Sequence, residues 1–335
     1  MRLPAILLGC VMMMALSSGS RAQDSTRARI EHLAEKDSIT VLITDSGLGG
    51  LSVCADIERR VREAGVYRKV RLVFANALPE SNRGYNKMAT TAEKVEVFDA
   101  ALSGMARWYN PDAILVACNT LSVLIPQTRF ARESPIPVLG IVETGVDMMY
   151  DRLNADPGAT GIIFGTETTI GMGTHKRLLV EKGIDSSRLV TQACSGLAGK
   201  IEEAAGGEEV RTAVNDFVTQ ALTQSPRQTG KIYAGLCCTH YGYSRGFFEE
   251  SFRQNGKGDA VIVDPNARMG EVLFPPGAKR RVERPDVRVE VVSRAVITPE
   301  ETASIGGLVE PVSPATAEAL RNYLLKKDLF PYTPR

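Results

Sequence analysis

Residues 113–120 read AILVACNT, and residues 232–240 read IYAGLCCTH. Each stretch starts with an apolar run of strand length and continues into a cysteine and polar residues, which predicts a thiol just beyond the end of a buried strand. Ligands of open α/β sheets bind in the crevice outside the carboxyl ends of the strands. Two such sites in two halves of one chain can face each other across a cleft, and two opposed thiols suggest proton transfer from two sides.

The chain around these stretches alternates between β-rich and helical segments. The predicted strands are 39–44, 70–75, 113–117, 138–142, 159–164, 189–192 and 232–236, with helical segments between them. Strands that alternate with helices are typical of a parallel sheet with crossover helices. Because the second half repeats the pattern of the first, we predict an α/β fold of two Rossmann-like lobes with mostly parallel sheets and the active site in the cleft between them.

The length of 335 residues suits two domains, since about 150 residues is a common domain size. We expect lobe one to comprise residues 38–138 and 245–335, and lobe two to comprise residues 139–244. The tail after residue 245 carries two more β runs, at 261–263 and 287–292, and is expected to return to complete lobe one.

Hydrophobic residues make up 44% of the chain, charged residues 24%, and the formal net charge is +1. This composition is ordinary for a soluble globular enzyme and gives no basic surplus for nucleic acid. We therefore expect no nucleic-acid partner, and no internal run is long enough to predict a membrane span.

The beginning of the chain has the pattern of a secretory leader. An apolar run at 3–16 follows a basic start and leads into small and polar residues at 17–22, where Ser20 and Ala22 fit a cleavage site. The run is shorter than the roughly 20 apolar residues that span a bilayer. Residues 1–22 are therefore predicted to be a signal peptide, with export to the periplasm.

Two alternatives for this end of the chain stay open. Cys10 follows Leu-Leu-Gly, which resembles a lipoprotein cleavage box, so a lipid anchor at Cys10 is one of them. The other is a cytoplasmic protein whose leader is not cleaved. Residues 23–37 are polar and are expected to form a spacer or a short helix before the folded body.

Cleavage after residue 22 would leave an odd number of cysteines: Cys54, Cys118, Cys194, Cys237 and Cys238. An odd set is a poor disulfide framework, and at least one thiol would stay unpaired even in an oxidising compartment. A free thiol retained there is more easily explained by chemistry than by crosslinking.

The three histidines do not suggest a metal centre. His32 lies in the polar spacer, and His175 has the Lys- and Arg-rich neighbours of a surface position. No cluster of ligands can be assembled from the sequence, so we predict no metal.

A glycine-rich turn, DSGLGGLS at residues 45–52, follows the first predicted strand. Ser52 stands where a dinucleotide-binding fingerprint needs its third glycine, so that interpretation fails. The amides of the turn can instead meet an anion at the N-terminus of the next helix. The alternative is that Asp45 or Ser46 only caps that helix.

Cys118 and Cys238 could each be a small buried hydrophobe. Both are followed by hydroxyl, amide or imidazole side chains, which line a core poorly and a polar ligand well. A helix N-terminus lowers the pKa of a thiol and so favours the thiolate that a general base requires. His240 can hydrogen-bond or protonate a group on the Cys238 side of the cleft, or it can cap a helix.

Taken in order, these motifs resemble the glutamate racemase branch of the aspartate/glutamate racemase superfamily, over about residues 40–270. The matching blocks are DSGLGGLSV at 45–53, RGYNK at 83–87, ACNT at 117–120, GIVE at 140–143, GTETTI at 165–170 and LCCTHY at 236–241. The resemblance implies two α/β lobes with the active site between them and no cofactor.

The activity that the resemblance implies is racemisation of glutamate, in which one cysteine removes the α-proton and the other returns a proton to the opposite face. It implies that Cys118 works on one enantiomer with Asp45 nearby, and that Cys238 works on the other with His240 nearby. Glu202, eight residues after a cysteine, matches the spacing of a further catalytic carboxylate of that family.

Other positions match substrate-holding residues of the family, where hydroxyls, amides and backbone donors grip two carboxylates and an ammonium. They are Asp45, Ser46, Gly84, Tyr85, Asn86, Asn119, Thr120, Thr239 and His240. Three features depart from the family pattern: Gly84-Tyr85-Asn86 replaces Pro-Tyr-Gly, Cys237 replaces a glycine, and Gly242 replaces a proline. These departures leave the acid/base set intact and bear on the identity of the substrate.

Other functions stay open. One is racemisation of aspartate or another acidic amino acid, and another is a decarboxylase or isomerase that needs one cysteine. A different class is an exported two-lobed protein that binds an acidic amino acid without turnover. The partner we expect is a small acidic amino acid, and because members of the family often form dimers, the resemblance allows a homodimer.

Overall fold

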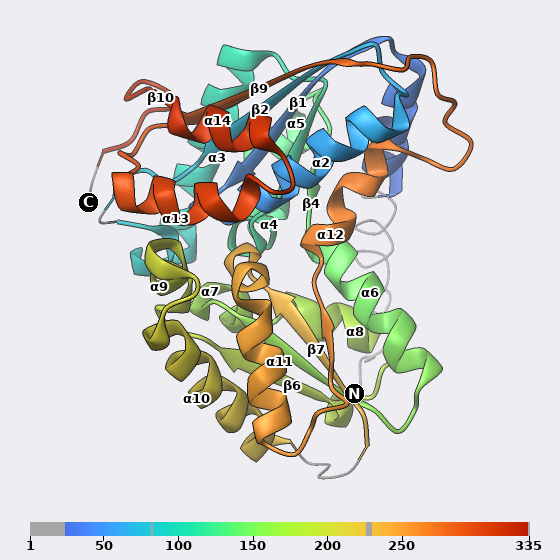
Figure 1. Ribbon diagram of the computed structural model, residues 1–335, viewed down its shortest axis with the longest axis vertical. Helices are drawn as coiled ribbons and strands as arrows, with labels where there is room; N and C mark the ends of the chain where they lie inside the picture. The colour runs from blue at the N-terminus through green and yellow to red at the C-terminus, as the bar shows by residue number, and fades with distance from the viewer. Residues whose placement is uncertain (1–23, 82, 226–229, 334–335) are drawn as a thin grey trace, which may run out of the picture.

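The computed structural model describes residues 24–81, 83–225 and 230–333 (Figure 1). The predicted signal peptide and Cys10 lie outside the described residues.

Six strands form the first sheet in the order β10-β9-β2-β1-β3-β4, and all neighbouring strands are parallel. The strands are β1 (Ser38–Asp45), β2 (Lys69–Asn76), β3 (Ala113–Val116), β4 (Val138–Gly140), β9 (Asp286–Ser293) and β10 (Leu324–Leu325). The last five residues of both β1 and β2 are buried. Continuous burial of this kind is expected where helices cover both faces of a parallel sheet.

Helices and short 3₁₀ turns cover this sheet. They are η1 (His32–Glu35), α2 (Leu51–Ala64), η2 (Tyr85–Lys87), α3 (Thr91–Tyr109), α4 (Asn119–Ser122), η3 (Ile125–Gln127), α5 (Arg129–Glu133), α12 (Asn266–Met269), η6 (Gly270–Leu273), α13 (Pro299–Val309) and α14 (Pro314–Arg321). On one face, Phe98 of α3 packs in a cluster with Leu42. On the other face, α2 and α14 pack with Val41. The sheet is therefore the middle layer of a three-layer lobe.

The second sheet has four parallel strands in the order β6-β5-β7-β8. They are β5 (Thr160–Gly165), β6 (Leu189–Ala193), β7 (Ile232–Cys237) and β8 (Val261–Val263). The helical elements of this lobe are α6 (Val142–Ala155), α7 (Glu167–Gly171), α8 (Thr174–Glu181), η4 (Ser186–Arg188), α9 (Leu197–Ala204), α10 (Glu208–Gln224), η5 (Thr239–Ser244) and α11 (Arg245–Gln254). The predicted α/β fold with two mostly parallel sheets is confirmed.

The two lobes lie one above the other in Figure 1, with β1 and β2 in the upper lobe and β6 and β7 in the lower. Their contact is more than a linker, because one hydrophobic cluster contains Leu42 of β1 together with Val146 and Met149 of α6. Helix α13 of the upper lobe also packs against α9 of the lower lobe. The strand ends of both sheets therefore meet at a packed junction.

The structure corrects the predicted lobe boundaries. Strand β8 pairs with β7 in the second sheet, and α11 packs against α10 and β8. The chain thus returns to the first lobe after Val263 rather than at residue 245. The predicted boundary at residues 138/139 also falls inside β4, which belongs to the first sheet. A run of three apolar residues carries no local sign of which sheet it joins, because strand pairing is a long-range contact.

The segment predicted as a polar spacer or short helix is helical and packs on the first lobe. Residues 24–31 are helical and η1 follows directly. Ile30, Leu33 and Ala34 are buried in the cluster that contains α2. Their spacing of three and four residues gives a helix one narrow apolar stripe. Because most of the other residues in this segment are charged or polar, its composition alone did not indicate that stripe.

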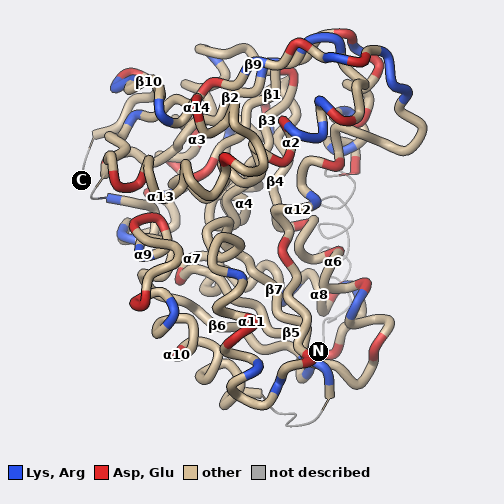
Figure 2. Tube along the Cα trace, viewed as in Figure 1, with Lys and Arg blue, Asp and Glu red and all other residues tan. Residues whose placement is uncertain are grey.

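The outside of both lobes carries charges of both signs. Figure 2 shows Lys and Arg interspersed with Asp and Glu along the chain. Among the described residues, we find no helix that is long and apolar enough to cross a membrane.

Candidate active site

Three polar segments meet where the two lobes join: the turn after β1, the start of α4 after β3, and the start of η5 after β7. The Thr239 hydroxyl donates a hydrogen bond to Asp45 Oδ2 at 2.6 Å. Asp45 is buried. Its carboxylate also accepts hydrogen bonds from the Cys118 thiol and from the Ser46 amide. One carboxylate therefore links both cysteine-bearing strand ends.

Cys118 lies in a buried, polar setting beside that carboxylate. Its Sγ is 3.1 Å from Ser46 Oγ, and the residue is 5% exposed. Burial and then the Asp45 carboxylate raise the pKa of Cys118 well above its usual value, while the Ser46 hydroxyl and the Leu121 amide lower it by less. The expected lowering by the helix N-terminus is thus outweighed, because α4 has only four residues and burial disfavours the thiolate.

Cys238 has a histidine and a carboxylate as neighbours. Its Sγ is 3.8 Å from His240 Nδ1, and His240 Nε2 lies 3.4 Å from Glu202 Oε1, an ion-pair distance without hydrogen-bond alignment. Burial lowers the pKa of His240, but Glu202 and Cys238 together outweigh burial, so the pKa is raised well above its usual value. An imidazolium at this position stabilises negative charge on the neighbouring sulfur.

Glu202 is also the hydrogen-bond partner of the glycine-rich turn at residues 45–52. The Leu48 amide donates to Glu202 Oε1, so the anion that meets this turn is a carboxylate of the other lobe. A Cβ at Gly49 would lie 2.4 Å from Thr239 Oγ1 and 2.8 Å from the His240 amide nitrogen. Glycine at this position allows the backbones of the two lobes to approach each other directly.

A Gly49→Ala variant should therefore force the two lobes apart at the site. Overpacking of a tight contact costs about 1–3 kcal/mol, which would show as a loss of turnover of about tenfold or more. The matched control is Gly246→Ala on α11, where an added Cβ meets nothing within 4 Å. Steady-state kinetics and thermal unfolding of both variants check this, and equal activity in the two would contradict it.

Two of the other candidate residues, Asn119 and Thr120, lie at the same junction. Thr120 Oγ1 lies 2.8 Å from Thr166 Oγ1 and 3.3 Å from Thr169 Oγ1, both on the second lobe. Asn119 is 2% exposed, and its Nδ2 has no hydrogen-bond partner among the described residues. A buried amide donor without a partner is available to a ligand.

The three candidate residues at 84–86 differ in their burial and in their distance from the site. Tyr85 is buried, and its hydroxyl donates to the Ala77 carbonyl at 3.2 Å. Burial and then the charge of Cys118 raise the pKa of Tyr85, which places the ring near that thiol. Asn86 is exposed on η2, and a Cβ at Gly84 would meet only Leu78, at 3.5 Å. The structure thus brings Tyr85 toward the thiol and leaves Asn86 exposed.

Sequence reasoning missed residues that form bonds between the two lobes near the site. His175 was expected at the surface, but it is 3% exposed, and its Nε2 is 3.0 Å from Asn119 Oδ1. Lys94 of α3 donates to Thr168 Oγ1 at 2.7 Å, which adds another bond between the lobes. The buried pair His175 and Leu179 on α8 is a helical i, i+4 stripe, and this spacing was the signal that could have placed His175 inside.

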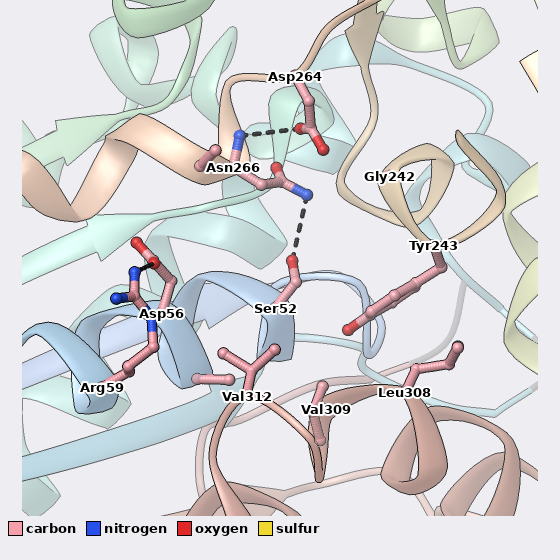
Figure 3. A pocket seen from close by; sticks show the side chains of 12 residues that line it. Ser52, Asp56, Arg59, Gly242, Tyr243, Asp264, Asn266, Leu308, Val309 and Val312 are labelled. Carbon is pink, nitrogen blue, oxygen red and sulfur yellow. Dashed lines mark hydrogen bonds and ion pairs between the residues drawn. The ribbon is translucent and has the colours of Figure 1, made fainter. Parts of the chain in front are cut away.

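A separate cavity of about 350 Å³ lies behind the loop of residues 238–241, which carries Cys238 (Figure 3). It is bounded by α2, by η5 and by the segments around Asp264 and Val309. Asn266 Nδ2 donates to Ser52 Oγ at 3.1 Å and to the Thr239 carbonyl at 2.9 Å, so Asn266 lies between this cavity and the loop. Neither Cys118 nor Cys238 lines the cavity. The cavity and the two thiols therefore lie on different sides of the loop.

The five described cysteines are free and buried. In the part of the chain that the structure describes, no three His, Cys, Asp or Glu side chains are grouped as metal ligands.

Two parallel-sheet lobes with thiols, carboxylates and a histidine at their junction are typical of an α/β enzyme. The family model described as Asp/Glu/Hydantoin racemase matches residues 41–229. The chain belongs to this racemase family and is an amino-acid racemase.

Curated relatives agree with this assignment. A glutamate racemase from Aquifex pyrophilus is 30% identical over 225 residues, which are 66% of this chain and 77% of the relative. A glutamate racemase from Vibrio vulnificus (strain CMCP6) is 30% identical over 233 residues, which are 67% of this chain and 76% of the relative.

Solved structures share the fold. The glutamate racemase of Francisella tularensis, crystallised in complex with D-glutamate, aligns with a TM-score of 0.61 and 18% identity over 82% of this chain and 94% of its own. A glutamate racemase isoform from Bacillus anthracis aligns with a TM-score of 0.60 and 20% identity over 87% of this chain and 96% of its own.

Proposed function

We propose that this racemase interconverts L- and D-glutamate without a cofactor, using Cys118 and Cys238 as the acid/base pair. The observation that carries the proposal is the bond between Asp45 and Thr239, which joins the two cysteine-bearing strand ends in one buried site. The names of the curated relatives and the D-glutamate in a structural neighbour support glutamate as the substrate.

The chemistry requires groups on two faces of one carbon. A thiolate removes the proton from Cα, the electron pair is left as a carbanion next to the carboxylate, and a thiol on the opposite face delivers a proton to that pair. No atom other than hydrogen is exchanged, so an acid and a base are sufficient. Each turnover leaves the two sulfurs with exchanged protonation states, and the new form is the one that acts on the other enantiomer.

The surroundings of the two sulfurs suit these roles. The raised pKa of Cys118 makes it the thiol, and therefore the acid, when the site is empty. The charged His240 stabilises negative charge on the neighbouring Cys238 sulfur, which suits a base at this position. Glu202 holds His240 through their ion pair. Asp45 lies beside Cys118, where it can accept the proton of that thiol or help restore its protonation state after turnover. Substrate carboxylates would be met by Ser46, Asn119, Thr120 and Thr239.

The test is solvent deuterium exchange at Cα of L- and D-glutamate, followed by NMR under reducing conditions on protein without residues 1–22. We expect exchange together with interconversion of the enantiomers. Binding of glutamate with no exchange would instead identify a binding protein. Exchange of aspartate in preference to glutamate would identify aspartate as the substrate. This outcome is tested because Gly84-Tyr85-Asn86 departs from the family pattern at substrate-holding positions.

We also propose that the protein is exported. The support is the pattern of residues 1–22, a basic start, a short apolar run and a small-x-small site. N-terminal sequencing of protein purified from the periplasm should give Gln23 as the first residue. A lipid-modified Cys10, or an intact Met1 in the cytoplasm, would each contradict this.

The homodimer allowed by the resemblance stays a prediction. Sedimentation equilibrium should give about twice the monomer mass if the chain follows its family, and the monomer mass would exclude this assembly.

A further inference from the structure

His175 makes a buried hydrogen bond from the second lobe to the first. It lies on α8, is 3% exposed, and its Nε2 is 3.0 Å from Asn119 Oδ1. Asn119 directly follows Cys118 and opens α4. The bond therefore connects a helix distant in sequence to the residue beside a catalytic thiol.

Both partners of this bond have one further polar atom that is buried and unpartnered. These atoms are Asn119 Nδ2 and His175 Nδ1, and neither has a hydrogen-bond partner among the described residues. Native proteins leave few buried polar atoms unpaired, so such a group suggests a site completed by a ligand. Asn119 Nδ2 carries two N–H donors, and the ligand group that best satisfies them is a carboxylate.

The state of the imidazole decides how the amide is oriented. Burial lowers the pKa of His175 to about 4, so the ring is neutral at physiological pH and has one N–H. Placed on Nε2, that N–H donates to Asn119 Oδ1. The amide oxygen is then engaged on one side, and rotation of the amide by 180° would set two donors against each other.

We propose that His175 is a positioning residue, which donates from Nε2 to Asn119 Oδ1 and so presents the Asn119 Nδ2 donors to a carboxylate of the substrate. This inference rests on the proposed amino-acid racemisation. His175 contacts Asn119 and not the reacting atoms, and it acts through that amide.

The other bonds between the lobes predict which kinetic constant changes. Thr120 contacts Thr166 at 2.8 Å, and Lys94 contacts Thr168 at 2.7 Å, both between the same two lobes. These bonds remain when His175 is replaced, so the lobes stay in register. The loss should therefore affect substrate binding more than the proton-transfer step.

The experiment compares His175→Phe, which keeps a planar ring but has no donor, with His175→Gln, which keeps an N–H donor. In His175→Phe we expect KM for both enantiomers of glutamate to rise about tenfold with kcat changed less than about threefold, because a buried carbonyl loses its partner and the amide is free to rotate. His175→Gln should restore most of the KM. The matched control is His32→Phe, since His32 is an exposed histidine that pairs with Glu35 on the same helical turn, away from the junction.

A double-mutant cycle separates positioning from stability. In an Asn119→Ala background, His175→Phe should cause no further rise in KM, because the group that it orients is gone. Thermal unfolding of each variant is measured alongside. An unchanged KM in His175→Phe would overturn the proposal, and so would additive effects in the cycle or a His175→Gln variant as impaired as His175→Phe.

Failure of the proposed function would be recognised separately. If the wild-type protein binds D-glutamate in calorimetry but does not racemise it, the proposed function fails, and the dissociation constants of the same variants test His175 directly. If the wild-type protein neither binds nor racemises an acidic amino acid, both proposals fail.

Discussion

Replacing Cys118 by serine should lower the rate of glutamate racemisation by about 10³-fold, within the range that a positioned acid or base contributes. The same loss is expected for Cys238→Ser. A serine hydroxyl in either place is too weak an acid, and its alkoxide too scarce, to exchange a proton with Cα. The rate is measured from the interconversion of the enantiomers by NMR or polarimetry.

The two variants should differ in which enantiomer still exchanges its α-proton. The remaining cysteine can remove a proton from its own face and return a deuteron to the same face, which gives exchange without inversion. Cys118→Ser should therefore exchange one enantiomer in D₂O and Cys238→Ser the other. Exchange of both enantiomers by either variant would contradict the division of labour between the two sulfurs.

The control for these variants is Cys54→Ser. Cys54 is buried in the cluster of α2, and Thr316 lies within hydrogen-bond reach of its thiol. A serine there changes a buried sulfur to oxygen in the same lobe without touching the junction. It should racemise glutamate at close to the wild-type rate, and loss of activity in this variant would show that the serine effects are structural.

The positions of Asp45, Cys118 and Cys238 could be predicted from the sequence because each lies at or just beyond the end of a strand that is recognisable locally. An apolar run sets the strand, and the strand end sets the edge of the sheet where the polar residue lies. Packing of the two lobes, in the cluster that contains Leu42 of β1 with Val146 and Met149 of α6, then brings these edges together.

His175 and β8 could not be predicted in the same way, because what decides them is a partner far along the chain. The Lys and Arg neighbours of His175 describe the solvent side of α8, whereas its own direction follows from packing against the first lobe. The glycines at 47 and 49 have the composition of an anion-binding turn, yet the structure fills it with Glu202 of the other lobe. Long-range contacts of this kind cannot be predicted from the local composition of the sequence.

An Asp45→Asn variant should lose activity and gain stability at neutral pH. Burial raises the pKa of Asp45 above its usual value, and the charge of His240 and the hydrogen bonds from Thr239, Cys118 and Ser46 only partly offset this. The native state therefore holds this proton at pH values where the unfolded chain has lost it. Stability from this group is present below the unfolded pKa and is lost as pH rises through the folded pKa.

At neutral pH the buried Asp45 thus weakens the fold, and its retention is explained by the chemistry beside Cys118. Asparagine is neutral at every pH, can accept from the Ser46 amide and can donate to the Thr239 hydroxyl. We expect racemisation to fall about 100-fold, as for the loss of a charged group that assists proton transfer. The midpoint of thermal unfolding at pH 7 should rise, by about 2–4 °C for each kcal/mol gained.

The pH dependence isolates this effect from the other carboxylates. The difference in unfolding midpoint between Asp45→Asn and the wild type should shrink as pH falls, since the wild-type side chain then becomes neutral too. Asp216→Asn on α10 removes an exposed carboxylate and should change neither the activity nor this difference. A variant that loses both activity and stability at pH 7 would mean that Asp45 holds the junction mainly through its bond to Thr239, with its charge a minor part.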